Sequence, residues 1–544
     1  MTKQGTDGGP DVDAVVVGAG FAGLATLHRL LGQGLTVQGY EAGSGVGGTW
    51  YWNRYPGARV DIESMEYSFP FPEIQQSWTW PEKYSGQADV RRYLEFVAEE
   101  LDLLGSIRFD TTVLAARFLA ESGDWEVTVR DGSDDTATIR SRYLVLATGF
   151  LSVPKVPDIP GLSDFRGVLA FTARWPEDPP QLEGTRIGVI GTAASGIQVI
   201  QTLAPIAQKL TVFQRTANWA FPLKNVPMTD EYDGWVKENY QLIRDSEYGN
   251  RGAGTILVGG RIVPPNPRSG LEATREEVIA DLDMRWNAGG PHVARSFIDI
   301  ISDESVNDIV REWWTGKIHE AVEDPEIAAK LIPDHRPMTR RPPGTTGYYE
   351  TYNRDNVQLV DIKADPIRAV VEDGIVLVSG EKHELDALIL ATGFDAGSGA
   401  AMQIDLRGRG GESIQDHWAH GVRTHLGLVV HGFPNLMLVD GPQSPSVHFS
   451  PPLLTAYQSE VVARVIAAAD ARGLQVEADR ESEEEWNREV DAQYAKTLIP
   501  QTDSWWMGAN IPGKPRRPVA YAGGFTAYRA HVDRWFAEQL ESGA

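Results

Sequence analysis

The stretch that decides the fold is Ala14-Val-Val-Val-Gly18-Ala-Gly20-Phe-Ala-Gly23. Its β-branched start predicts a buried parallel strand, and a helical pattern follows over residues 24–31. A second strand is predicted over residues 36–40, and it ends at Glu41. Strand, glycine-rich turn, helix and strand together predict a βαβ unit that holds a dinucleotide at its turn.

The three glycines of this turn have different physical roles. Gly18 permits the tight turn, Gly20 lets the backbone approach a pyrophosphate, and Gly23 lets helix and strand pack closely. The N-terminus of the helix supplies partial positive charge. Glu41 stands at the spacing of an acid that binds ribose hydroxyls. A simple glycine-rich turn would not need this acid, so we predict a dinucleotide site that also includes the turn residues Phe21 and Ala22.

A second unit of the same kind lies farther along the chain. Strands are predicted over residues 186–190 and 209–213, with a helix that ends at about residue 204 between them. The turn that follows the first of these strands is Gly191-Thr-Ala-Ala-Ser-Gly196. The chain therefore contains two nucleotide-binding folds in series.

The second turn departs from the usual pattern in ways that affect its ligand. Ala193 stands at the position of the middle glycine, where its methyl group would crowd a pyrophosphate. Arg215, followed by Thr216, stands where an NAD site has an acid. The planar fork of donors on an arginine suits a 2′-phosphate, so the second site is predicted to prefer NADPH. A surface arginine at a strand end is the alternative interpretation.

The remaining pattern predicts how the chain is divided. A proline-rich connector spans residues 153–160, and a helical pattern without clear strands covers about 225–335. Strand signals return at residues 357–361 and 386–390. We predict an α/β fold with two Rossmann-like dinucleotide-binding domains, for FAD and NADP, and a helical insertion. The expected boundaries are 1–150 with 390–544 for the FAD domain, 151–222 with 336–389 for the NADP domain, and 223–335 for the insertion.

Composition excludes several classes of function. The 544 residues contain no cysteine, which removes thiolate metal sites and the flavin reductases that use a cysteine pair. Two dinucleotide sites without a thiol imply that a flavin takes hydride from a nicotinamide. The formal net charge of −25 argues against nucleic acid and anionic lipid as partners. Without a signal-peptide pattern or a long apolar run, a cytoplasmic protein is expected, and we favour a monomer.

One further segment identifies a family. Gly47-Gly48-Thr49-Trp50-Tyr51-Trp52-Asn53-Arg54-Tyr55-Pro56-Gly57-Ala58-Arg59-Val60-Asp61 resembles the signature [A/G]-G-x-W-x-x-x-x-[F/Y]-P-[G/M]-x-x-x-D of type I Baeyer–Villiger monooxygenases. We call residues 47–61 the signature segment. The resemblance extends over about residues 13–530 and includes 213–216, 347–355 and 504–513. It is strongest to the phenylacetone, steroid and camphor-pathway ketone monooxygenases.

The resemblance implies a reaction and a catalytic pair. In this family NADPH reduces FAD, O₂ then gives a flavin C4a-peroxide, and this adds to a ketone that rearranges to an ester or lactone. By position in the motif, Arg341 would be the cation that holds the negative charge, and Asp61 would orient it. An exposed loop arginine and a carboxylate that caps a turn are the alternative interpretation of these two residues.

The resemblance also implies which residues contact the cofactors. FAD would be lined by Gly48, Thr49, Trp50, Tyr51, Trp52, Asp61, Tyr67 and Val113. NADP would contact Arg59, Val60, Thr192, Ala193, Ala194, Ser195, Gly196, Ile197 and Gln198, and Trp505 would cover its ribose. Arg340 stands where the family has lysine and would share the 2′-phosphate with Arg215 and Thr216. For Trp505, a buried core indole is an equally good interpretation.

Two departures from the family leave alternatives open. The family motif F-x-G-x-x-x-H-x-x-x-W-P is met at Phe165, Gly167, Trp175 and Pro176, but Phe171 replaces its histidine. Together with Ala193, this change keeps an uncoupled NADPH oxidase open as an alternative. A flavin-dependent N- or S-oxygenase is the other alternative, although it would not require the Arg341–Asp61 pair. The loop over residues 441–452 resembles the substrate-side loop, and we interpret its His448 as polar lining.

Overall fold

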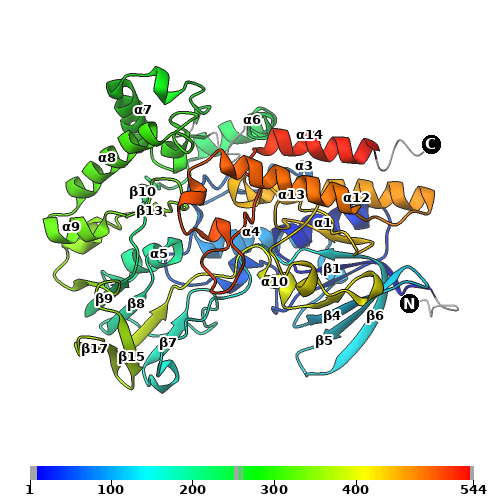
Figure 1. The fold of residues 1–544 in the computed structure, drawn as a ribbon, viewed down its shortest axis with the longest axis horizontal. Helices are drawn as coiled ribbons and strands as arrows, with labels where there is room; N and C mark the ends of the chain where they lie inside the picture. The colour runs from blue at the N-terminus through cyan, green and yellow to red at the C-terminus, as the bar shows by residue number, and fades with distance from the viewer. Residues whose placement is uncertain (1–8, 250–256, 259–260, 539–544) are drawn as a thin grey trace.

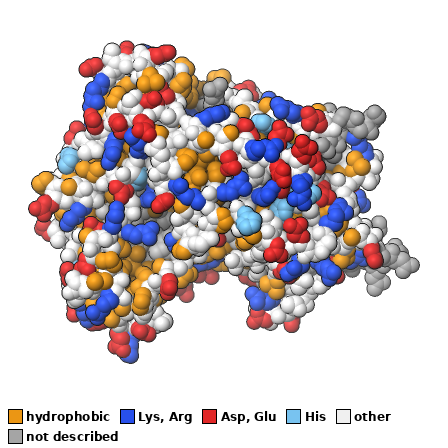
Figure 2. All heavy atoms as spheres, in the orientation of Figure 1, with side chains coloured by type: hydrophobic (Ala, Val, Ile, Leu, Met, Phe, Trp, Pro, Cys, Tyr) orange, Lys and Arg blue, Asp and Glu red, His pale blue; other side chains and the backbone are white. Residues whose placement is uncertain are grey.

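The computed structural model describes residues 9–249, 257–258 and 261–538. Two sheets lie side by side, and a group of helices lies beyond the second sheet at the upper left of Figure 1. No helix in these ranges is both long and apolar enough to cross a membrane. On the face in Figure 2, basic and acidic side chains are mixed, and neither sign forms a separate field.

The first sheet contains the first predicted βαβ unit. Its order is β19-β4-β5-β6-β1-β2-β3, and β20 also pairs with β6. Strands β1, β2, β3, β6 and β20 run parallel, whereas β5 is antiparallel to both β4 and β6. The strands are β1 Val12–Val17, β2 Val37–Tyr40, β3 Ile107–Arg108, β4 Thr112–Leu119, β5 Asp124–Arg130, β6 Thr136–Leu146, β19 Asp405–Arg407 and β20 Leu436–Leu438.

Two long helices cover one face of this sheet. Helix α1 (Phe21–Gly32) follows the glycine turn, and α12 (Pro451–Arg472) packs beside it (Figure 1). The side-chain oxygens of Thr26 and Ser459 approach to 3.1 Å between the two helices. Because β1, β2, β6 and β20 run parallel, the carboxyl ends of β2, β1 and β20 lie at the same edge of the sheet. Folds of this kind bind ligands at that edge.

The second sheet is entirely parallel, as the second predicted unit requires. Its order is β14-β9-β8-β18-β7, and α5 (Ala194–Leu203) follows β8. A three-stranded antiparallel meander is attached to it. The strands are β7 Val168–Phe171, β8 Arg186–Ile190, β9 Lys209–Gln214, β14 Val357–Asp361, β15 Ile367–Val371, β16 Gly374–Leu377, β17 Lys382–Glu384 and β18 Ala387–Leu390.

The predicted insertion is mainly helical. Its helices are α6 Asp230–Tyr248, α7 Arg275–Ala288, α8 Glu304–Ala321 and α9 Pro325–Leu331. Each begins at a side chain that accepts hydrogen bonds from the first turn, namely Thr229, Thr274, Asp303 and Asp324. The expectation of no strands here was wrong, because a short hairpin joins β11 (Leu257–Val258) to β12 (Arg261–Ile262).

The remaining elements connect these parts. Strands β10 (Phe221–Pro222) and β13 (Gly344–Thr345) pair where the chain enters and leaves the insertion. The other helices are α2 Thr49–Trp52, α3 Pro72–Gln75, α4 Gln87–Glu100, α10 Gly399–Met402, α11 Ile414–His417, α13 Arg480–Ala495 and α14 Phe525–Phe536. The α/β class with two nucleotide-type units is confirmed, whereas the domain boundaries stay a prediction.

Candidate active site

The first glycine turn is shaped to accept an anion. Gly18 has a φ of +107°, and a Cβ on Gly23 would lie 1.9 Å from the carbonyl oxygen of Gly18, so neither position tolerates a side chain. Helix α1 starts after Gly20 without any side-chain cap. Its first N–H groups are therefore directed at whatever lies in front of the turn, and a pyrophosphate fits this cradle.

Glu41 has a second role that the sequence did not indicate. Its carboxylate accepts the backbone N–H of Ala19 and of Gly43, both at 2.8 Å. Burial raises the pKa of this carboxyl, and these two N–H groups oppose that rise. Glu41 thus fastens the glycine turn to the end of β2 and lies where the sequence expected an acid for a ribose.

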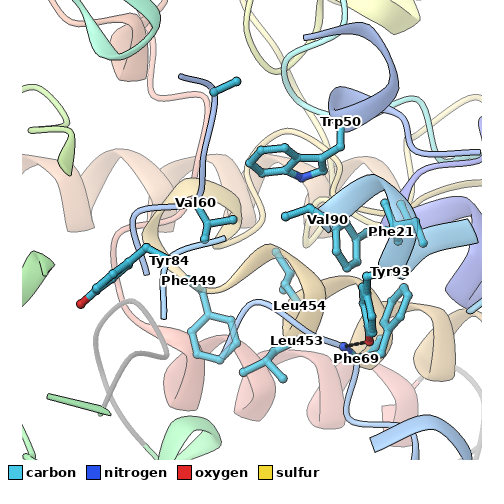
Figure 3. Close-up of a cluster of buried hydrophobic side chains, with 14 of the residues drawn as sticks. Phe21, Trp50, Val60, Phe69, Tyr84, Val90, Tyr93, Phe449, Leu453 and Leu454 are labelled. Carbon is cyan, nitrogen blue, oxygen red and sulfur yellow. Dashed lines mark hydrogen bonds between the residues drawn. The ribbon is translucent and has the colours of Figure 1, made fainter. Parts of the chain in front are cut away.

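The signature segment forms the wall next to this turn. A Cβ on Gly20 would lie 3.2 Å from the Cα of Gly48, so turn and segment touch through their glycines. The Trp50 indole N–H donates to the Tyr67 hydroxyl at 3.1 Å, and the Phe21 ring meets Tyr67 edge-on. Figure 3 shows Trp50 and Val60 in one apolar cluster with Phe21 from α1. These contacts bring predicted flavin-side residues together.

Arg341 and Asp61 form the predicted pair. The Nη2 of Arg341 lies 2.6 Å from one carboxylate oxygen of Asp61 and 2.7 Å from the other. The Asn218 side chain donates to the Arg341 carbonyl at 3.1 Å and fixes its backbone. The Asp61 side chain is 12% exposed and that of Arg341 is 40% exposed, so part of the guanidinium remains open to a ligand. Asp61 therefore orients a cation and does not act as a simple turn cap.

The second glycine turn repeats the geometry of the first. Gly191 has a φ of +110°, and a Cβ on Gly196 would lie 2.1 Å from the Gly191 carbonyl oxygen. Helix α5 begins after Ala193, again without a side-chain cap. The Thr192 hydroxyl donates to the Thr216 carbonyl at 2.8 Å and ties the turn to the end of β9. This arrangement also fits a dinucleotide phosphate.

The signature segment holds the two units together. The Tyr55 hydroxyl donates to Gln198 at 2.8 Å, and the Gln198 amide donates to the Arg59 carbonyl at 3.0 Å. The Arg59 guanidinium instead contacts Glu82 and the carbonyl of Tyr84, both at 3.1 Å. The predicted contact of Arg59 with NADP stays a prediction, and the structure brings only its carbonyl to the second unit.

Gly57 of the signature segment lies against α5 of the second unit, and its replacement should destabilise the protein. It has a φ of +85°, and a Cβ would lie 2.1 Å from the Thr202 hydroxyl and 2.7 Å from the Gln198 carbonyl. Gly57→Ala is expected to cost at least about 1–2 kcal/mol from the left-handed backbone alone. Thermal unfolding should show a lower Tm, whereas Gly316→Ala, inside α8 with open space around it, should raise Tm slightly. An unchanged Tm for Gly57→Ala would contradict the close approach.

Three cations gather at the end of β9, and one of them was not predicted. Burial lowers the pKa of Lys155, and the charge of Arg215 lowers it further. Burial also lowers the pKa of Arg340; Asp334 opposes this, and Arg215 adds to it. Within the described ranges, no carboxylate forms an ion pair with Lys155, Arg215 or Arg340. Three such cations close together fit a phosphate. Lys155 lies in the proline-rich connector, which gave no sign of this role.

The segment that contains Trp505 contacts Lys155 of this group. Trp505 begins a short 3₁₀ turn, Trp505–Met507, and its ring centroid is 6.1 Å from that of Phe150. Lys155 donates to the carbonyl of Asn510 a few residues later. Trp505 is half-buried and packs against buried residues that include Phe150, and its predicted contact with the ribose stays a prediction.

Phe171 belongs to the second sheet. It ends β7, pairs with Leu390 and packs on the apolar cluster of that sheet. Two residues that follow it, Arg174 and Trp175, contact the signature segment. The Trp175 N–H donates to the Trp52 carbonyl at 3.3 Å, and the Arg174 guanidinium lies 4.4 Å from the centre of the Trp52 ring. Phe171 thus fills space in the second sheet, whereas Arg174 and Trp175 attach this part of the chain to the signature segment.

Most residues of the loop over residues 441–452 are buried. Phe449 is buried and stacks on Phe525 at 4.3 Å between centroids. His448 and the Tyr494 hydroxyl lie 2.8 Å apart, and burial lowers the pKa of the imidazole to about 4. No group of His, Asp or Glu in the described part of the chain forms a metal site.

Comparison with known proteins matches the chain along nearly its whole length. The model of a family described as flavin-binding monooxygenase-like matches residues 12–227. Acetone monooxygenase (methyl acetate-forming) from Gordonia sp. strain TY-5 is 40% identical over 530 residues, which are 95% of this chain and 96% of that protein. Phenazine N-monooxygenase from Lysobacter antibioticus is 37% identical over 96% of this chain and 94% of its own. A crystal structure of OTEMO in complex with FAD and NADP has a TM-score of 0.93 at 36% identity and covers 98% and 99% of the two chains.

Proposed function

Because the chain belongs to the flavin-binding monooxygenase-like family, we propose that it is a Baeyer–Villiger monooxygenase that uses NADPH and O₂ to convert ketones to esters or lactones. The single observation that carries this proposal is the Arg341–Asp61 pair beside the signature segment. FAD would bind at the Gly18–Gly23 turn and NADP at the Gly191–Gly196 turn, with domain boundaries as the sequence predicts.

Bound FAD supplies the chemistry that no side chain here can perform, because it accepts hydride from NADPH and activates O₂. The protein must then hold negative charge on the attacking oxygen and on the alkoxide that forms from the ketone carbonyl. Arg341 is a permanent cation with an accessible edge, so it can hold this charge in both stages. Asp61 keeps the guanidinium in one orientation, which lowers the cost of arranging it at the moment of reaction.

The cations at the end of β9 would select the coenzyme. Arg215, Lys155 and Arg340 present positive charge without ion-pair partners in the described chain, which favours a ligand with an extra phosphate. NADPH carries this phosphate on its ribose and NADH does not. The protein is therefore expected to use NADPH in preference to NADH.

A panel of ketones tests the proposal. The FAD-loaded enzyme is supplied with NADPH and with small methyl ketones, cyclic ketones or aryl ketones, and product mass is measured together with NADPH consumption. We expect one ester or lactone for each NADPH consumed, with the inserted oxygen derived from isotope-labelled O₂. NADPH consumption that yields only hydrogen peroxide with every ketone would contradict the proposal and favour an uncoupled oxidase.

N-oxidation is a second candidate, because one relative of similar identity is named a phenazine N-monooxygenase. Transfer of oxygen to nitrogen forms no alkoxide on a carbonyl, so it does not need a cation at that place. Phenazines and thioethers in the same panel distinguish the two reactions. The presence of the Arg341–Asp61 pair makes ketone oxidation the better supported function.

A further inference from the structure

Asp440 lies at the ligand-binding edge of the first sheet. It follows β20, whose residues pair with β6, and the Val439 N–H continues this pairing by donating to Leu146 at 3.0 Å. Its backbone has a φ of +57°, a left-handed conformation that aspartate adopts more readily than most residues other than glycine. Its N–H donates a hydrogen bond of 2.7 Å to Gln458 of α12.

The order of the strands places Asp440 toward the flavin end of the proposed FAD site. Across the carboxyl edge of the sheet lie Glu41 after β2, the Gly18–Gly20 turn after β1, and Asp440 after β20. An extended dinucleotide with its ribose at Glu41 and its pyrophosphate at the turn must continue toward β6 and β20. Its ring end would thus approach Asp440. This step depends on the FAD site proposed above.

One hydroxyl group and two tyrosines lie near the Asp440 carboxyl. Its Oδ1 accepts a hydrogen bond of 2.7 Å from the hydroxyl of Ser446, and within the described chain it forms no ion pair. Tyr67 beside the signature segment and Tyr528 on α14 are near enough for its charge to raise their pKa values. Arg341 acts on Tyr67 in the opposite direction. The pKa of Tyr67 therefore depends on the charges of both the Arg341–Asp61 pair and Asp440.

Burial raises the pKa of Asp440 to about 7, and the Ser446 hydrogen bond opposes this rise. The protonated form of this carboxyl is therefore accessible near neutral pH. A protonated carboxyl has one O–H to donate, and Oδ1 is already an acceptor for Ser446. Among the described residues, no side chain or N–H group hydrogen-bonds to the second oxygen, so a ligand can engage it.

We propose that Asp440 is a positioning residue for the flavin, and that its protonated carboxyl donates a hydrogen bond to an acceptor at the ring end of FAD. Loss of this proton would place a negative charge beside the ring. Because the ring gains negative charge on two-electron reduction, the carboxylate would make reduction harder. Asp440 would thus make the ease of flavin reduction depend on pH near neutrality.

The midpoint reduction potential of bound FAD tests this proposal without any turnover. It is measured against reference dyes, from mildly acidic to mildly alkaline pH, for the wild type, Asp440→Asn and Ser446→Ala. The wild type and Asp440→Asn should agree at acidic pH and diverge above about pH 7, with the wild type harder to reduce. Ser446→Ala should shift this divergence to higher pH, because the lost hydroxyl stabilises the carboxylate form.

Asp405→Asn is the matched control, because it removes an exposed carboxyl from edge strand β19 of the same sheet. It should leave the potential unchanged at every pH. Parallel pH curves for the wild type and Asp440→Asn would overturn the proposal. If Asp440→Asn does not fold, a Ser446→Ala curve identical to that of the wild type overturns it instead. Failure to bind FAD would refute the proposed function itself, whereas normal ester formation with coinciding curves would refute only this inference.

Discussion

Arg341→Ala is expected to lower the rate of ester formation by about 10²–10³-fold, the usual cost of losing one group that holds developing negative charge. The variant keeps both glycine turns, so FAD binding and NADPH oxidation should continue, with hydrogen peroxide released in place of ester. The measurement is ester yield by mass together with NADPH and peroxide concentrations at saturating ketone. An Arg341→Ala enzyme that forms ester at the wild-type rate would contradict the role of this cation.

Two companion variants separate charge from orientation. Arg341→Lys keeps the charge but loses the planar fork, so its activity should lie between those of the wild type and Arg341→Ala. Asp61→Asn leaves the guanidinium in place without its counter-charge, and should lower the turnover rate more than it changes KM for the ketone. Arg275→Ala, which removes an exposed arginine paired with Glu312, is the control and should behave as the wild type. Oxidation of a thioether should suffer less than ester formation in Arg341→Ala.

Arg215→Ala is expected to raise KM for NADPH about 10–100-fold, because charged hydrogen bonds of this kind contribute about 1.5–3 kcal/mol. KM for NADH should hardly change, since NADH has no 2′-phosphate to lose contact with. Steady-state kinetics with both coenzymes and one ketone measure the effect. Equal weakening of NADPH and NADH would show that Arg215 supports the turn in general and does not recognise the phosphate.

Lys155→Ala and Arg340→Ala test whether the three cations act as one group. Each should raise KM for NADPH in the same direction as Arg215→Ala. Because the charges of Arg215 and its two neighbours influence one another, the effects of the double variants should not be additive. Lys330→Ala, which removes a lysine from the end of α9, is the control for a simple loss of positive charge.

The sequence predicted those elements whose signals lie within one short stretch of the chain. The β1–α1–β2 and β8–α5–β9 units and strand β14 were found at or near their true limits, because buried strands and glycine turns have strong signals. Strands β4, β5 and β19 were not predicted. The pairing of β19 with β4 joins segments nearly three hundred residues apart, which no local pattern can show, whereas β4 and β5 form a local hairpin that the sequence analysis did not recognise. The β11–β12 hairpin was missed because each of its strands has only two residues.

The site was predictable only where a motif marked it. Arg341 and Asp61 are 280 positions apart, and without the resemblance nothing in the chain connects them. Lys155 gave no signal, because it becomes part of the site only through the close approach of Arg215. Asp440 could have been found by asking which acid follows a strand at the ligand edge, but β20 has only three residues and was not recognised.

The difference in how the helices begin has a practical consequence for handling this enzyme. Helices α6 to α9 complete their own first turns with threonine or aspartate, whereas α1 and α5 leave theirs for phosphate groups. When FAD and NADP are removed from the protein, the two glycine turns should unfold more readily than the helices of the insertion. Storage with excess FAD and NADP⁺ should extend its shelf life, because ligands that bind only the folded state stabilise it.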